Sequence, residues 1–170
     1  MPQRDSLLNT FLVATVLCVV CSLAVSSAAV VLRPRQEANE QLDQQKNILD
    51  ATGLAIGEYG VQASLLTRDQ IAELNGWISQ KLVNLETGEY TDEMDIERYN
   101  LVEATGNTET SVSIDEPEYD PGEPRRPKVM KVFFVKQPGS EKIQQVVLPI
   151  FGKGLWGTLY GYLALRSDLE

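Results

Sequence analysis

The sequence predicts an α+β protein in which one N-terminal transmembrane helix precedes a small mixed domain of helices and strands. Three observations predict this class. Residues 7–32 carry no charged side chain, two later segments have apolar residues at helical spacing, and four segments between residues 81 and 165 resemble strands. A length of 170 residues allows one domain of ordinary size together with such an appendage.

The uncharged run from Leu7 to Leu32 follows a short N-terminal segment, residues 1–6. At about 1.5 Å per residue the run exceeds the roughly 30 Å hydrocarbon core of a bilayer, so it can span a membrane with some tilt. A cleaved signal peptide is the competing interpretation. Its apolar region is usually about 7 to 15 residues long after a basic start, whereas only Arg4 precedes this longer run. A retained anchor is therefore preferred.

The charges next to the anchor give a weak indication of orientation. Arg33 and Arg35 outnumber Arg4, and the positive-inside rule applied to these alone places the large domain in the cytoplasm. Cys18 and Cys21 lie inside the span, where we interpret them as small apolar residues that pack against lipid or another helix.

Composition excludes several kinds of chemistry. The formal charge of −9 lies outside the first 32 residues and repels phosphate backbones, so we expect no nucleic-acid partner. The sequence has no histidine and no cysteine outside the span, which excludes Ser-His and Cys-His nucleophiles and thiolate or histidine metal sites. We therefore predict no catalytic side chain and no metal site, and any catalysis would need a cofactor.

Two helices are predicted between the anchor and the first strand. Residues 33–53, which begin with Arg33-Pro34-Arg35, are predicted to form a membrane-proximal amphipathic helix that Gly53 ends. Thr67 with Gln70 three residues later is a capping box that begins a second helix, which Gly76 ends.

The strand candidates follow this second helix. "KLVNLETGEYT" (81–91) is a strand that runs into a turn, and "VMKVFFV" (129–135) with "KIQQVVLPI" (142–150) forms a hairpin around Pro138-Gly139. Between them, residues 103–127 have the composition of an exposed loop with four prolines. Its five carboxylates match no calcium-loop spacing, so we interpret them as solvated: Asp115, Glu116, Glu118, Asp120 and Glu123.

The last strand candidate, "LWGTLYGYLAL" (155–165), separates into two faces on a pleat. One face is aliphatic with two glycines, and the other carries aromatic residues. We expect a central strand whose glycines admit a helix and whose tyrosines cover the far side of the sheet.

The anchor followed by "RPRQEANEQLDQQKNIL", the "LVNLETGEY" turn and above all "VLPIFGKGLWGTLYGYLAL" resemble the C subunit of the sodium-translocating NADH:quinone oxidoreductase. The resemblance implies a single-pass protein of the bacterial inner membrane with its flavin domain in the periplasm, which overrides the charge-based orientation. It also implies covalently held FMN and partner subunits in a membrane-embedded sodium pump of six subunits.

In that family the FMN phosphate is esterified to the threonine of a Ser-Gly-Ala-Thr motif. The motif is absent from this sequence. The resemblance therefore covers only the N-terminal portion of such a protein, and we expect residues 54–170 to be an FMN-binding-type α+β domain that is incomplete at its C-terminus.

The resemblance suggests that Leu155 and Trp156 lie near the flavin ring, although core packing would explain the tryptophan equally well. Lys153 and Arg166 are candidates for phosphate contacts, with plain surface placement as the alternative. The leading hypothesis is an electron-transfer flavoprotein subunit that lacks its attachment motif, so that this chain alone is inactive. The alternative is a membrane-anchored extracytoplasmic sensor or binding module without redox chemistry.

Overall fold

The structure, a computed structural model, describes residues 7–114, 125–136, 138–140 and 142–167. Its contacts divide the chain into two compact units, Met1–Asp43 and Gln44–Glu170. The α+β class predicted from the sequence is confirmed, because a long apolar N-terminal helix precedes a small strand-rich domain.

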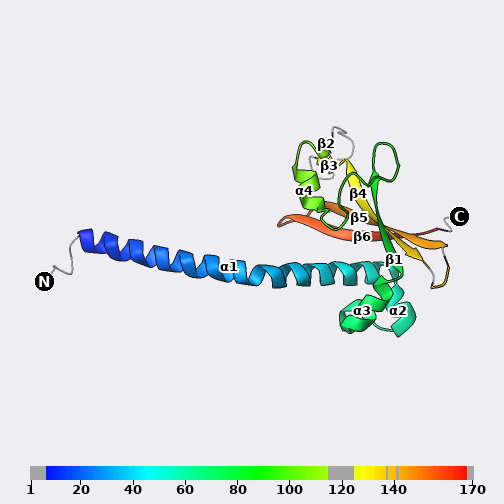
Figure 1. The fold of residues 1–170 in the computed structure, drawn as a ribbon, viewed down its shortest axis with the longest axis horizontal. Coiled ribbons are helices and arrows are strands. Elements are labelled where there is room, and N and C mark those ends of the chain that lie inside the picture. Colours follow the sequence, from blue (N-terminus) through cyan, green and yellow to red (C-terminus); the bar gives the residue numbers. More distant parts are fainter. Residues whose placement is uncertain (1–6, 115–124, 137, 141, 168–170) are drawn as a thin grey trace. The chain divides into compact units, whose positions relative to one another are not determined.

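The first unit consists of most of helix α1 (Leu7–Thr52), drawn in blue to cyan in Figure 1. Its N-terminal part is long and apolar enough to cross a membrane, which makes it a candidate span. The sequence predicted separate helices over 7–32 and 33–53, whereas the structure has one continuous helix with Pro34 inside it. Proline removes one intrahelical hydrogen bond, and the Arg33 Nε to Glu37 Oε1 ion pair of 2.9 Å bridges the same turn.

The second unit is built on a four-stranded antiparallel sheet in the order β1-β4-β5-β6. Its strands are β1 (Ile78–Asn84), β4 (Val129–Lys136), β5 (Ile143–Lys153) and β6 (Thr158–Arg166). The predicted β4–β5 hairpin is confirmed, and Gly139 supplies the left-handed conformation in its turn, at φ 75°. All four predicted strands are present with shifted ends.

The segment predicted as a loop over 103–127 is partly structured. It contains the end of α4 (Leu101–Gly106) and the short antiparallel pair β2 (Ser111–Ser113) and β3 (Arg125–Pro127). The Asn100 side chain caps α4 by accepting from the amides of Val102 and Glu103. The cap residue precedes the predicted loop, so the composition of residues 103–127 did not reveal the helix. The five carboxylates of the predicted acidic loop lie outside the described residues.

Short helices connect α1 to the sheet. Gly53, at φ 71°, separates α1 from α2 (Leu54–Tyr59), and a 3-10 turn (Ala63–Leu65) leads to α3 (Arg68–Asn75). The predicted capping box at the start of α3 is confirmed: Gln70 N donates to Thr67 Oγ1, and Thr67 N donates to Gln70 Oε1.

The core of the second unit lies between one face of the sheet and the last turns of α1. Ile48 of α1 packs with Phe133, Val135 and Val147, which are all buried. The Gln145 side chain of β5 also donates to the main-chain carbonyl of Thr52, at 3.2 Å. This bond gives a partner to one of the free carbonyls at the end of the helix.

Candidate functional site

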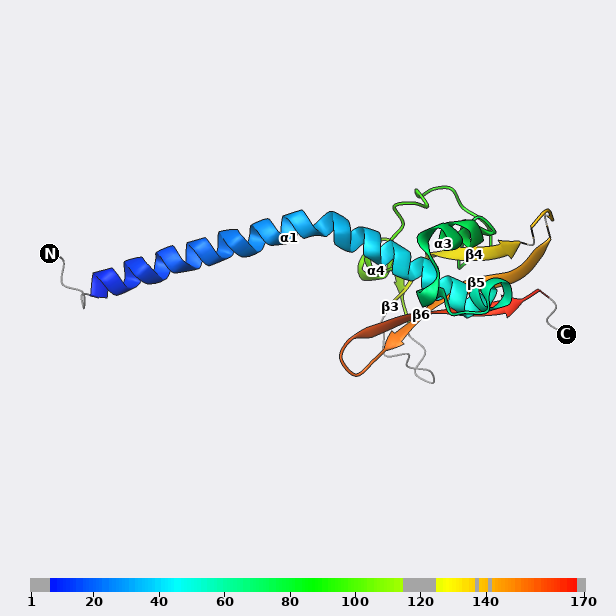
Figure 2. The same cartoon turned by 90° about the horizontal axis from the view of Figure 1, so that it is seen from below.

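The turn between β5 and β6 carries Leu155 and Trp156 at its tip. Figures 1 and 2 show this turn extending past the ends of the other strands of the sheet. The Gly154 amide donates to the Gly157 carbonyl at 2.8 Å and closes the turn. A Cβ atom on Gly154 would lie 2.7 Å from Leu159 Cγ and 2.8 Å from the Gly157 carbonyl oxygen. Only glycine fits there, and the closed turn leaves both tip side chains outside.

Both side chains of the tip are almost fully exposed, Leu155 at 91% and Trp156 at 95%. Tryptophan contributes a large apolar area that is favourable to bury. Among the described residues, both side chains of the tip therefore lie outside the buried core.

The aliphatic face of the β5–β6 hairpin continues from the tip. Ile150, Leu159 and Leu163 lie on the same side of the sheet because Ile150 pairs with Gly161 and Leu148 with Leu163. Each of the three is between 46% and 69% exposed. Contiguous exposed apolar surface of this kind is typical of a binding site. We call Ile150, Leu159 and Leu163 the aliphatic face.

The structure corrects the expected environment of the last strand. Within the described residues β6 lies at the edge of the sheet and not at its centre. Its aromatic side faces the core, where Tyr162 and Ala164 pack on the buried cluster. Among the described residues, a Cβ on Gly161 would meet only the Ile150 side chain, at 3.6 Å, so no described helix requires this glycine.

Lys153 and Arg166 lie at opposite ends of the hairpin. Lys153 pairs with Thr158 and Arg166 with Gln145, so eight residues of β6 separate the two ends. At about 3.3 Å per residue, the two cations are roughly 27 Å apart. They cannot bind one phosphate together, and Lys153 is the one near the tip.

The residues at the tip suit the ring of a flat aromatic ligand. An indole face and aliphatic side chains can stack on such a ring and exclude water from it. Lys153 is a single exposed cation beside them. The chain thus offers a surface for a ring and one charge for an anionic group, but no Ser-Gly-Ala-Thr motif for covalent attachment. Among the described residues, no group of three or more His, Cys, Asp and Glu side chains could hold a metal ion.

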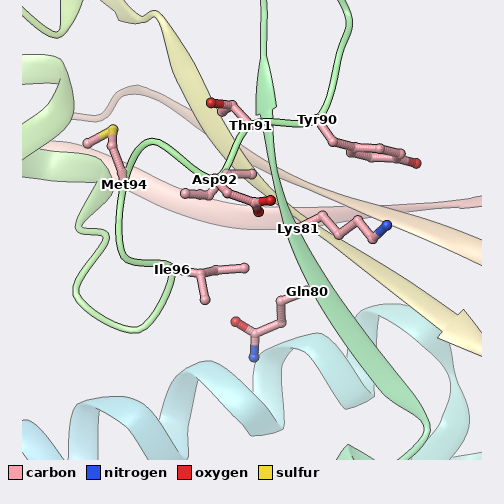
Figure 3. Close-up of a pocket in the computed structure, with 8 residues that line it drawn as sticks. Gln80, Lys81, Tyr90, Thr91, Asp92, Met94 and Ile96 are labelled. Carbon is pink, nitrogen blue, oxygen red and sulfur yellow. The ribbon is translucent and has the colours of Figure 1, made fainter.

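A second concave site lies beside β1, with a volume of about 290 Å³ (Figure 3). Leu82 forms its buried floor, and Met94 and Ile96 form a wall. Gln80, Thr91 and Asp92 also line it. Sequence reasoning missed this site because residues 92–99 show no periodicity; the only local signal was the strand that runs into a turn at 81–91.

A single candidate membrane span followed by a small strand-rich domain defines a class of α+β proteins with one candidate N-terminal anchor. No family model matches the sequence. Over nearly its whole length, however, the chain is homologous to curated proteins named as the C subunit of Na(+)-translocating NADH-quinone reductase. The resemblance inferred from the sequence is thereby confirmed.

The relative from Haemophilus ducreyi is 38% identical over 167 residues, which are 98% of this chain and 60% of that protein. The relative from Pseudomonas aeruginosa is 36% identical over 170 residues, 100% of this chain and 62% of that protein. The chain therefore spans about three fifths of the length of these relatives.

A solved structure supports the same relationship. The crystal structure of Shewanella oneidensis NqrC is similar with a TM-score of 0.63 and 26% sequence identity, covering 77% of this chain and 55% of that one. The relatives are named as subunits of a sodium-translocating NADH-quinone reductase, an oxidoreductase complex of several subunits.

Proposed function

We propose that this chain contributes to an electron-transfer flavoprotein subunit of a sodium-pumping NADH:quinone reductase, anchored in the bacterial inner membrane by α1. The observation that carries the proposal is the exposed Leu155 and Trp156 tip beside the aliphatic face. The proposed reaction is taken from the names of the relatives: electrons pass from NADH to quinone, coupled to sodium transport.

The cofactor of the proposed function is FMN, which supplies one- and two-electron transfer when bound. Trp156 and Leu155 would hold the ring by stacking and keep water from it, and Lys153 would face an anionic group.

The proposed location of the second unit is the periplasm. The family resemblance supports this side, against the weak bias of Arg33 and Arg35. The proposed partners are membrane lipid around residues 7–32 and the other members of a complex of six subunits. The proposed domain organisation keeps residues 7–32 as the span and residues 54–170 as part of the flavin-binding domain.

Flavin binding tests the role of the tip. FMN added to the 170-residue chain in non-ionic detergent should quench the fluorescence of Trp156, and a Trp156→Leu variant should lose the saturable part of binding. Trp77→Phe is the matched control because it removes the other tryptophan and leaves the tip unchanged. Saturable FMN binding that survives Trp156→Leu would contradict the site.

A gene deletion tests the role in the complex. Membranes from the deletion strain should lose sodium-dependent NADH:quinone reductase activity, and the native gene on a plasmid should restore it. Unchanged activity in the deletion strain would exclude the proposed function. It would favour the second candidate, an extracytoplasmic binding module, which the separate pocket beside β1 supports.

A further inference from the structure

We propose that the free edge of β1 at Gln80 binds an extended segment of a partner polypeptide, with one apolar side chain of that segment in the pocket lined by Leu82, Met94 and Ile96. The inference does not depend on flavin or on the proposed electron transfer. It follows from the direction of the main-chain groups of β1, the path of residues 89–96 and the charge on the pocket wall.

The main-chain groups of Gln80 point away from the sheet. The Trp77 carbonyl accepts from Lys136 on the β4 side, at 2.9 Å, whereas the Leu82 carbonyl accepts from Thr91 on the opposite side, at 3.0 Å. Successive residues of a strand direct their main-chain groups alternately to its two sides. Gln80 therefore shares the outward direction of Leu82.

The chain itself begins a further strand on this edge and then leaves it. Asn84 N donates to Glu89 O at 2.9 Å, Val83 forms a bridge with Tyr90, and Thr91 N makes the last bond, to Leu82. After Thr91 the chain turns away through Asp92. Within the described ranges, the outward main-chain groups of Gln80 have no partner. An unpaired donor and acceptor in line with a strand are suited to strand addition.

The pocket lies where the chain departs from the edge. All the residues labelled in Figure 3 line the pocket. The Gln80, Met94 and Ile96 side chains lie on one side of β1, and those of Lys81 and Tyr90 extend to the other. Alternate side chains of an added strand would point to the side of Leu82, Met94 and Ile96. An apolar side chain of the added segment would thus meet an apolar floor and wall.

The charge on the pocket wall selects a basic neighbour for that side chain. Asp92 lines the pocket and has no ion-pair partner among the described residues. The cations nearby are engaged elsewhere. Lys81 Nζ lies 4.3 Å from the centroid of the Tyr90 ring, and Lys131 Nζ lies 5.8 Å from that of Tyr99. Arg98 pairs with Asp95. The added segment should therefore carry Lys or Arg two residues from its apolar residue, on the same face of the strand.

The test measures binding of two dye-labelled peptides to the full chain in non-ionic detergent. The peptides are acetyl-Lys-Val-Ile-Val-Lys-amide and its counterpart with Glu in place of Lys. We expect saturable binding of the basic peptide, weakened by salt, and weaker binding of the acidic one. Absence of saturable binding of the basic peptide, or equal binding of both, would overturn the proposal.

Variants at Gln80 distinguish strand addition from adsorption to the surface. Gln80→Pro removes the outward amide and leaves the bonds to β4, so it should weaken binding about tenfold. Gln80→Val keeps the amide and should bind like the unchanged chain. Equal binding by the two variants would overturn the proposal. Circular dichroism should show the same strand content in both.

Two further measurements complete the test. Asp92→Asn should lower the affinity for the basic peptide by up to about fivefold and reduce its salt dependence. The basic peptide should also slow hydrogen exchange of the Gln80 amide in the unchanged chain. If the Gln80 amide exchanges equally fast with and without saturating peptide, the edge is not the binding site.

Discussion

Phe133 of β4 and Tyr162 of β6 meet edge to face, with their ring centroids 5.8 Å apart and their planes at 80°. Phe133 is only 3% exposed, and Tyr162 packs against the same cluster as Ile48 of α1. This pair decides which side of the last strand is buried. It leaves the other side, with Leu159 and Leu163, as the exposed aliphatic face.

We expect Phe133→Ala to reduce the free energy of unfolding by about 3–5 kcal/mol, because it removes a buried ring and leaves a cavity. Tyr160→Ala is the matched control. Tyr160 lies on the same side of β6 as Tyr162 but is 53% exposed, so its loss should cost about 1 kcal/mol. Urea unfolding followed by circular dichroism measures both, and equal losses would contradict this account of the core.

The capping box of α3 gives a second prediction. Thr67→Ala removes the acceptor for the Gln70 amide and should cost about 1 kcal/mol of stability, whereas Thr67→Ser keeps the hydroxyl and most of the stability. Thermal unfolding in the same detergent compares them. The cap would have no measurable role if the alanine and serine variants unfolded at the same temperature.

Gly154→Ala tests the geometry of the tip. The new methyl group would overlap the Gly157 carbonyl and the Leu159 side chain, so we expect a loss of about 1–3 kcal/mol and a rearranged turn. Gly57→Ala in α2 is the control, since nothing lies within 4 Å of its added Cβ and alanine should add about 0.5–1 kcal/mol. Urea unfolding of both variants checks the two opposite signs, and a Gly154→Ala protein of unchanged stability would show that the turn has more room than described.

Alkaline pH should destabilise the second unit through Tyr99. Burial raises the pKa of this phenol to about 12, and its hydroxyl donates to the Val129 carbonyl at 2.7 Å. The unfolded phenol titrates near pH 10, so this contribution to stability is complete below about pH 10 and is lost as the pH rises to about 12. Burial also raises the pKa of Tyr162, which acts in the same direction.

Tyr99→Phe removes this titrating group. The variant should therefore show a smaller decrease in the free energy of unfolding between about pH 10 and 12 than the unchanged chain. Denaturant unfolding at a series of pH values measures the slope. An identical slope in the two proteins would show that Tyr99 does not contribute to it.

Local sequence features predicted much of this fold because their physical causes are local. The uncharged run, the Thr67 and Gln70 cap and the alternation in the strands each depend on residues a few positions apart. The sequence did not predict the continuous helix through Pro34 or the β2–β3 pair, because neither follows from a local pattern. A single proline costs one hydrogen bond, and β2 and β3 pair across a long stretch of chain.

The candidate span, the α+β class, the family resemblance and the two contrasting sides of the last strand all follow from the order of the amino acids alone. The amino-acid order alone does not show which side of the last strand is buried. That side is set by contacts with Ile48 and Phe133, which are far from β6 in the chain. The separation of Lys153 from Arg166 and the pocket beside Gln80 likewise emerge only from the folded chain. Such relationships depend on strand order and register, which join residues distant in the sequence.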